Sequence, residues 1–187
     1  GLAVRIFTVG YVPARTSGRN TKYQDARVLN TTGIYSVVRH PLYLGNFIIW
    51  LGVSLFIRLW WFTALICLIF WLYYERIIYA EEQFLEEKFG QEFLEWAQRT
   101  PTFFPKLKNW TKANLRFSWK TVLKREYSSF FAIIVSFTVL EIITDIVSRS
   151  RWGIDEVWVF IFSLSLVIYL ILRTLKKRTT ILNVEGR

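Results

Sequence analysis

Four long apolar runs dominate this chain and leave little freedom in how it can fold. They cover residues 42–57, 59–80, 130–147 and 157–172. The charged side chains gather in blocks between the runs, whereas a water-soluble protein spreads them over its whole surface. Apolar segments of this length cross a bilayer as helices, because a helix satisfies its backbone hydrogen-bonding groups internally. The sequence therefore predicts an all-α fold, a polytopic transmembrane helical bundle.

The first two runs predict a two-span helical hairpin, the core of the fold, over residues 42–80. Asn46 and Ser54 interrupt the first run, and Arg58 separates it from the second. The tryptophans and tyrosines near the ends of the second run favour the headgroup level of a membrane. Sixteen residues of helix rise about 24 Å, which is short but sufficient for a span. The two outer ends of the hairpin, Arg39-His40 and Glu81-Glu82, must then return to the same membrane face.

The remaining segments predict shorter elements. Residues 1–12 are apolar apart from Arg5 and end at Pro13, so they resemble the tail of a longer helix, and the chain is expected to be an N-terminally truncated fragment. Residues 81–98 alternate as a cytoplasmic amphipathic helix, with Gly90 as a candidate break. Residues 106–125 carry seven Lys or Arg among apolar side chains, which is typical of a basic interfacial helix. We expect a core over 1–107 and an appended part over 108–187.

Charge and composition exclude several classes of protein. The net charge of +10 lies at the edges of hydrophobic segments, where it is explained by anionic lipid and by the positive-inside rule and not by nucleic acid. A single cysteine, Cys67, and a single histidine, His40, argue against a disulfide framework and against a metal site. The basic blocks at 106–125 and 173–178 predict that the hairpin's outer ends face the cytoplasm, in what we expect to be a bacterial inner membrane.

The polar stretch from Gly33 to Gly45 is the first candidate for a functional site. It places Arg39, His40 and two tyrosines at the mouth of a membrane segment, where polar groups are costly unless they pair or bind a ligand. A proline at the start of a helix pre-sets the backbone, and the unpaired amide groups of that helix start attract an anion. Glu81-Glu82 on the partner segment could hold an amine or hydroxyl groups. Such a set suits a zwitterionic cofactor. The alternative from the residues alone is ordinary topology signalling, with a solvated helix start at Glu81.

Two motifs carry a resemblance to a known family. They are Gly33-x-Tyr35-x-x-x-Arg39-His40-Pro41-x-Tyr43-x-Gly45 and Glu81-Glu82-x-x-Leu85-x-x-x-Phe89-Gly90-x-x-Phe93, followed by Thr100-Pro101. Over residues 13–107 the chain resembles the integral-membrane methyltransferases, which include isoprenylcysteine carboxyl methyltransferases and phospholipid N-methyltransferases. The family usually has tyrosine where this chain has Phe93. The appended part resembles extended bacterial members.

The resemblance implies S-adenosylmethionine as cofactor and a lipid or lipidated molecule as methyl acceptor. Carried over by position, the cofactor-binding residues would be Arg27, Val28, Leu29, Asn30, Tyr35, His40, Pro41, Leu42, Tyr43, Glu81 and Glu82. Arg76 is the nearest match to an arginine linked with substrate in the family, although it stands about one position off. The resemblance names no catalytic residue, and nothing in the sequence identifies the acceptor atom or the oligomeric state.

Two other functions stay open at this point. Membrane sterol reductases use a similar hairpin and an Arg-His-Pro-x-Tyr-x-Gly segment with NADPH, but they usually have an acidic residue after the glycine, where this chain has Asn46. A non-catalytic membrane scaffold is the other alternative, although a scaffold has no need of cofactor motifs. Retention of S-adenosylmethionine or of NADPH by the purified protein would separate the two enzyme classes.

Overall fold

The structure, a computed structural model, describes residues 1–13, 28–149 and 155–184. Within these ranges the chain is helical and irregular, with one isolated β-bridge between Gly33 and Thr111. The predicted all-α class is confirmed. In chain order the elements are α1 (Leu2–Tyr11), η1 (Ile34–Ser36), α2 (Pro41–Phe56), α3 (Trp60–Phe89), α4 (Gln91–Arg99), η2 (Leu107–Asn109), α5 (Trp119–Arg149) and α6 (Glu156–Arg178).

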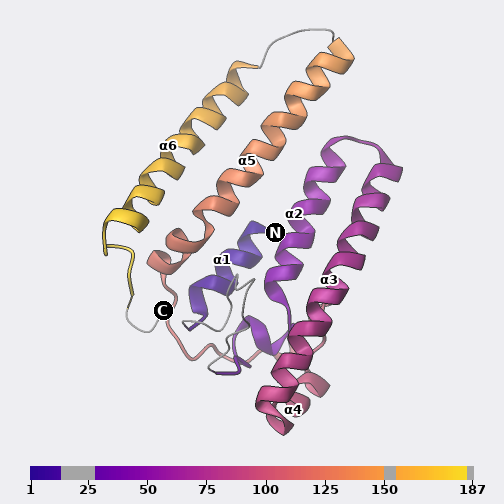
Figure 1. The fold of residues 1–187 in the computed structure, drawn as a ribbon, viewed down its shortest axis with the longest axis vertical. Helices are drawn as coiled ribbons and strands as arrows, with labels where there is room; N and C mark the ends of the chain where they lie inside the picture. The colour runs from indigo at the N-terminus through magenta and orange to yellow at the C-terminus, as the bar shows by residue number, and fades with distance from the viewer. Residues whose placement is uncertain (14–27, 150–154, 185–187) are drawn as a thin grey trace.

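The described helices form two antiparallel pairs with the short helix α1 between them, and the short helix α4 follows the end of α3. Figure 1 shows α2 beside α3 and α5 beside α6, with α1 lying between α2 and α5 and in contact with both. The start of α2, the end of α3, the start of α5 and the end of α6 all point toward the same end of the molecule, where α4 also lies (Figure 1). Residues far apart in sequence therefore meet at this end.

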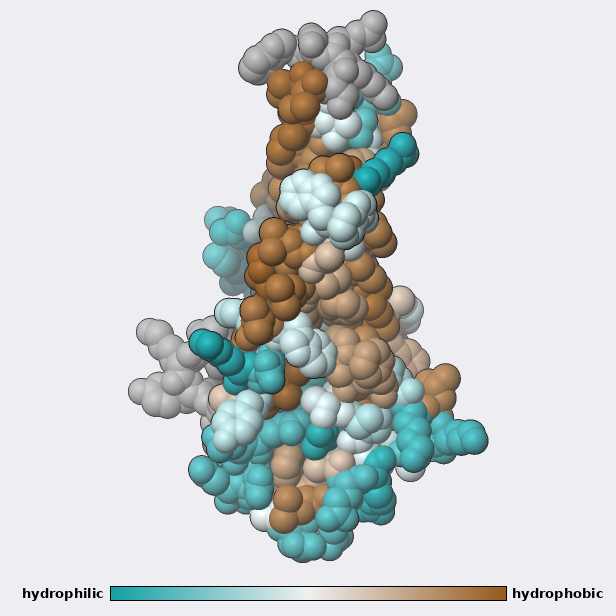
Figure 2. All heavy atoms as spheres, turned by 90° about the vertical axis from the view of Figure 1, so that its right-hand side faces the viewer, coloured by the Kyte–Doolittle hydropathy of each residue, from teal (hydrophilic) through white to brown (hydrophobic). Residues whose placement is uncertain are grey.

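The apolar lengths of α3, α5 and α6 are sufficient to cross a membrane. No more than 11% of the most apolar window of each helix is buried within the protein, so their side chains face outward. Figure 2 shows the result on the hairpin side, an apolar column standing above a hydrophilic base. Helix α2 has only 16 residues and is shorter than α3, α5 and α6, so its crossing of the membrane stays a prediction.

The boundary predicted between residues 80 and 81 is wrong. Helix α3 runs without interruption from Trp60 to Phe89, about 45 Å, so Glu81 and Glu82 extend a candidate membrane helix and do not begin a new one. The break comes at Gly90, whose φ of 54° lies in the left-handed region that favours glycine. Helix α4 then ends at Arg99, before Pro101, as the sequence predicted.

A separate basic helix over residues 106–125 is also absent from the structure. Only residues 119–125 are helical there, as the first turns of α5, and η2 is three residues long. The reason is that the backbone of this stretch bonds to other segments. The amide of Lys106 donates to Val37 (2.9 Å), that of Gly33 to Thr111 (3.0 Å) and that of Ser118 to Gly10 (2.9 Å). These bonds tie the stretch to α1 and to the loop before α2.

Candidate active site

The loop that leads into α2 is held in place from both sides. Gly33 has a φ of 62°, and the Ser36 hydroxyl donates to its carbonyl at 2.7 Å. The amides of Arg39 and His40 donate to the carbonyls of Pro101 (2.9 Å) and Thr102 (3.3 Å), just beyond α4. The stretch that follows α4 therefore fixes the backbone from which the His40 side chain projects.

His40 lies between two carboxylates, as the hairpin argument predicted. Its Nε2 is 2.9 Å from Glu82 Oε1, and its Nδ1 is 3.6 Å from Glu81 Oε2. The imidazole is only 6% exposed. Burial disfavours its charged form, but hydrogen bonds and attraction from Glu81 and Glu82 outweigh that penalty and raise the pKa of His40 above its usual value. With a carboxylate facing each ring nitrogen, the geometry favours the imidazolium.

The two glutamates have different roles in this arrangement. Glu82 Oε1 lies 3.3 Å from the Nε of Arg39 as well as 2.9 Å from the Nε2 of His40, so one carboxylate contacts both cations of the loop. Glu81 accepts a hydrogen bond from the Tyr43 hydroxyl at 2.8 Å. The Tyr43 ring stacks on His40, with ring centres 5.4 Å apart and planes 8° from parallel.

A cavity of about 1500 Å³ opens beside this cluster. Of the residues predicted to bind cofactor or substrate, those that line it are Val28, Leu29, Asn30, Tyr35, His40, Pro41, Leu42, Tyr43, Arg76 and Glu81. Glu82 does not line the cavity, because it lies behind His40 and holds that side chain. Arg27 lies outside the described residues.

An aromatic and apolar compartment forms one end of the cavity, near the junction of α3 and α4. Leu29 and Trp96 are buried there together, with Tyr35 and Leu85 packed against them. The Trp96 indole donates to the carbonyl of Tyr35 at 3.0 Å, which fixes α4 against the loop. A flat apolar group would find contacts on several sides here.

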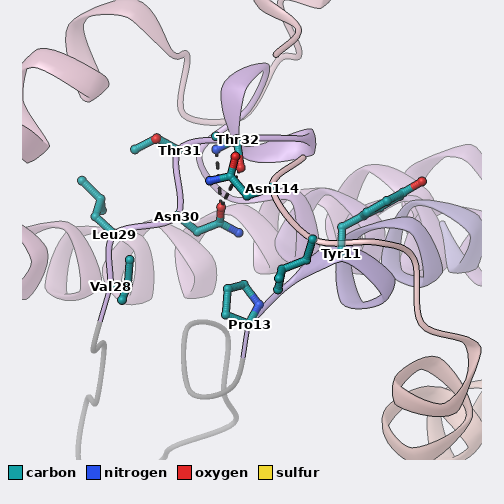
Figure 3. A pocket seen from close by; sticks show the side chains of 9 residues that line it. Tyr11, Pro13, Val28, Leu29, Asn30, Thr31, Thr32 and Asn114 are labelled. Atoms are coloured by element: carbon teal, nitrogen blue, oxygen red, sulfur yellow. Dashed lines mark hydrogen bonds between the residues drawn. The ribbon is translucent and has the colours of Figure 1, made fainter. Parts of the chain in front are cut away.

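A second, smaller cavity of about 70 Å³ lies beside the loop. Figure 3 shows Asn30 projecting into it between Thr32, Asn114 and Pro13. Asn30 Oδ1 accepts from the amide of Thr32 at 3.4 Å. Since Val28, Leu29 and Asn30 line both cavities, this segment forms the wall between them.

A polar cluster lies farther along the large cavity, between α1, α2 and α5. Arg5 makes a bidentate pair with Glu126, with Nε–Oε2 and Nη2–Oε1 distances of 2.7 and 2.8 Å. Its Nη1 donates to Asn46, and the Asn46 amide in turn donates to the Tyr74 hydroxyl at 2.9 Å. The Tyr74 ring lies 5.0 Å from that of Tyr43, so the cluster adjoins the glutamate–histidine site.

Sequence reasoning missed most of this second cluster. In the sequence, Asn46 departs from the reductase pattern and interrupts an apolar run, Arg5 interrupts an apolar piece, and neither pattern indicates a partner. A signal was present, since both are polar residues within apolar runs, where such groups need partners. The partner Glu126 could not be found, because it is 121 residues from Arg5 and follows a basic stretch.

Comparison with known proteins shows which family the first half of the chain resembles. Residues 7–92 match the family described as phospholipid methyltransferase. Over these residues, a little under half of its length, the chain is similar to this family, whose members are S-adenosylmethionine-dependent methyltransferases. No solved structure matches the chain.

Three curated relatives show its similarity to particular proteins. The chain is 40% identical to the cobalt-zinc-cadmium resistance protein CzcN of Cupriavidus metallidurans and 38% identical to the nickel-cobalt-cadmium resistance protein NccN of Alcaligenes xylosoxydans. Each match covers 57% of this chain and 47% or 48% of the relative. It is 33% identical to the protein-S-isoprenylcysteine O-methyltransferase of Schizosaccharomyces pombe, over 46% of this chain and 36% of that enzyme. The chain thus spans about half the length of the first two relatives.

Proposed function

We propose that this protein transfers a methyl group from S-adenosylmethionine to a membrane-embedded acceptor with a lipid-like body. The observation that carries the proposal is the single large cavity that joins the His40–Glu81 cluster to the apolar faces of α2, α3 and α5. Pockets for one small ligand usually measure about 300–1000 Å³. At about 1500 Å³ the cavity has room for a cofactor and for part of a second molecule.

The residues present fit S-adenosylmethionine. Pro41 begins α2, so the amides of Leu42 and Tyr43 in the first turn have no partner within the helix and can bind the cofactor's carboxylate. The positive charge favoured on His40 supports an anion at the same place. The Glu81 carboxylate, whose side chain is 36% exposed, is available for an amine or a ribose hydroxyl. The compartment of Leu29, Tyr35 and Trp96 suits an adenine ring.

The protein's contribution to the reaction would be orientation and the exclusion of water. When bound, S-adenosylmethionine would supply an electrophilic methyl group on a sulfonium, and a lone pair of the acceptor would bond to the methyl carbon in line as the carbon–sulfur bond breaks and the neutral thioether leaves. Glu82 and the stacked Tyr43 ring hold His40 in one orientation, and the Tyr43 hydroxyl holds the Glu81 carboxylate. Because these groups are fixed before the ligands arrive, alignment costs little entropy at the moment of reaction.

We further propose that the site opens toward the cytoplasm and that α2 and α3 act as a membrane hairpin. The start of α2, the end of α3, the start of α5 and the end of α6 lie toward one end of the molecule (Figure 1), and the end of α6 carries Arg173, Lys176, Lys177 and Arg178. Basic residues beside membrane helices favour the cytoplasmic side. Cysteine substitutions at the exposed Lys108, followed by labelling from each side of sealed vesicles with an impermeant reagent, test this orientation.

The activity is tested by giving S-adenosylmethionine with a labelled methyl group to membranes that contain the full chain. We expect label in the lipid extract, and none with Glu81→Gln. The matched control is Glu86→Gln, an exposed carboxylate on the same helix outside the cavity, which should retain activity. If Glu81→Gln and Glu86→Gln incorporate equal amounts of label, the site assignment is wrong. If no variant incorporates label and the purified protein retains NADPH instead, the methyltransferase proposal fails.

A further inference from the structure

Four polar side chains, one from each of the helices α5, α1, α2 and α3, are linked by hydrogen bonds along the wall of the large cavity. In this order they are Glu126, Arg5, Asn46 and Tyr74. All four line the cavity, so the bonds between them lie at its surface. The direction of these bonds decides where the last proton, that of the Tyr74 hydroxyl, points.

The direction of each bond follows from the chemistry of the groups. Glu126 accepts two bonds from Arg5, which holds the guanidinium in one orientation. A guanidinium has only donors, so the Asn46 side chain must turn its oxygen toward Arg5 and its NH2 group toward Tyr74. The Tyr74 oxygen therefore accepts the bond from Asn46, at 2.9 Å, and its own proton must point elsewhere.

The Tyr74 proton has no acceptor among the described residues of the protein. The bond from Asn46 is the only hydrogen bond that the hydroxyl makes with them. The ring is fixed by stacking on the buried Phe70, with ring centres 4.0 Å apart and planes 17° from parallel. Since Tyr74 lines the cavity, a molecule in the cavity is the available acceptor of this proton.

The glycine that ends the first motif makes room for this series of bonds. Gly45 directly precedes Asn46, and a Cβ added at Gly45 would lie 2.6 Å from the Cγ of Arg5. Carbon atoms in contact lie about 3.5–4.0 Å apart, so an alanine at this position would displace Arg5 from Asn46. The position of Arg5 thus depends on glycine at this point of α2.

Tyr74 lies between the proposed cofactor residues and the apolar part of the cavity. On one side, its ring is 5.0 Å from that of Tyr43, whose hydroxyl donates to Glu81. On the other side, its partner Asn46 precedes Ile49 by three residues on one face of α2, where the lining is apolar. The Tyr74 hydroxyl is therefore placed to contact a molecule that lies beside the cofactor.

We propose that Tyr74 binds the methyl acceptor by donating a hydrogen bond to it, and that Asn46 and Arg5 are positioning residues that direct this donor. The proton stays on Tyr74 throughout the reaction. The bond would go to a lone pair other than the one that attacks the methyl carbon, so it fits a polar group with at least two lone pairs. A neutral amine, with one lone pair, does not meet this condition. This inference rests on the proposed function, because it assigns a residue to the second substrate of the same cavity.

The alternative is that the bond between Asn46 and Tyr74 only holds α2 against α3. Asn46→Asp separates the two explanations. An aspartate of the same size accepts from Arg5 with one oxygen and from the Tyr74 hydroxyl with the other, so it keeps both links but turns the proton away from the cavity. If the bond is only structural, Asn46→Asp should behave like the wild-type protein. Under the proposal it should behave like Tyr74→Phe.

The direct test observes the hydrogen bond on a bound probe, N,N-dimethyldodecanamide with an isotope-labelled carbonyl group. The probe is uncharged, accepts hydrogen bonds through its carbonyl oxygen and donates none. It is bound to the full chain in detergent, and its carbonyl band is measured by isotope-edited infrared spectroscopy. A hydrogen bond lowers the frequency of this band. We expect the band at lower frequency in the wild-type protein than in Tyr74→Phe and Asn46→Asp.

Tyr79→Phe is the matched control for this test. Tyr79 lies on the same helix, its oxygen also accepts from a side-chain amide, that of Gln83 at 2.8 Å, and it does not line the cavity. This variant should give the wild-type band. Circular dichroism checks the fold of each variant, and Asn46→Asp carries the test if Tyr74→Phe does not fold. A band at the wild-type frequency in either Tyr74→Phe or Asn46→Asp would overturn the inference.

Methyl transfer and cofactor binding are measured on the same variants. With labelled S-adenosylmethionine, Tyr74→Phe should lower the rate of label incorporation about fivefold or more, which corresponds to about 1 kcal/mol for one lost hydrogen bond, and should leave cofactor affinity unchanged. An equal fall in cofactor affinity would place Tyr74 against the cofactor and overturn the inference. If the cofactor does not bind but the band of the probe still depends on Tyr74 and Asn46, the proposed function fails while the donor site stands.

Discussion

The buried pair between Arg5 and Glu126 gives the sharpest test of how the C-terminal helices are attached. The residues are 7% and 5% exposed, and the pair is bidentate. Replacing Glu126 with leucine leaves a guanidinium buried without a counter-ion. Removing one partner of a buried ion pair costs about 3–5 kcal/mol, whereas replacing both by apolar residues is often close to neutral.

We therefore expect Arg5→Met and Glu126→Leu each to destabilise the protein by about 3–5 kcal/mol. The double variant should be destabilised less than either single variant, because no charge is left buried without a partner. We expect a remaining loss of about 1–2 kcal/mol, because Asn46 and Ser129 lose the guanidinium as a hydrogen-bond partner. Neutral hydrogen bonds between membrane helices contribute only about 0.6 kcal/mol on average. A single-variant loss above about 2 kcal/mol would accordingly point to the unpaired charge.

The assay is reversible unfolding in mixed micelles with increasing sodium dodecyl sulfate, followed by circular dichroism. Glu92→Leu, an exposed carboxylate on α4, is the control and should change stability by less than about 0.5 kcal/mol. Additive losses in the double variant would refute the reasoning, since they would mean that the two side chains do not act as a pair.

The remaining predictions concern the cofactor residues and the helix break. Tyr43→Phe removes the hydroxyl that donates to Glu81, and we expect about 1 kcal/mol, or roughly fivefold, weaker S-adenosylmethionine binding by calorimetry; unchanged affinity would contradict this role. Because the pKa of His40 is raised in the folded protein, its contribution to stability is complete below about pH 6.5 and is lost as pH rises through the folded-state pKa. The melting temperature should therefore fall as pH rises over that range. The variant His40→Gln should show no such dependence of melting temperature on pH. A Cβ added at Gly90 would contact no other atom, but the backbone there has a φ of 54°, which is unfavourable for alanine. Gly90→Ala should therefore lower the free energy of unfolding by about 1 kcal/mol through backbone strain alone. An increase in stability would disprove this.

The sequence predicted the elements whose physical cause is local. Apolar runs of 22, 18 and 16 residues predicted the helices found as α3, α5 and α6, and proline and glycine predicted where the helices end. The closeness of His40 and Glu81 also followed from the sequence, because a hairpin without a long loop returns its two ends to one face. That prediction is confirmed at 3.6 Å.

The failures share a different cause. The stretch over 106–118 has the composition of an amphipathic helix, but its amides and carbonyls bond to Val37, Gly33 and Gly10. Helix α3 continues through Glu81, because neither proline nor glycine interrupts it before Gly90. Pattern alone cannot show whether a polar residue in a helix begins a new element or continues the old one.

By itself, the sequence determined the helical class and the membrane character, since both follow from the pattern along one segment, whereas the candidate cofactor residues came from the resemblance to the methyltransferases. Only the tertiary structure decided which side chains share a cavity. It placed Glu82 against His40 and outside the lining of that cavity, paired Arg5 with Glu126, and brought Arg125 and Lys176 to the lining of the same cavity as Arg76. The reason is physical: a buried charge is satisfied by whichever partner the packed helices bring near, and no local pattern records a contact between residues more than a hundred positions apart.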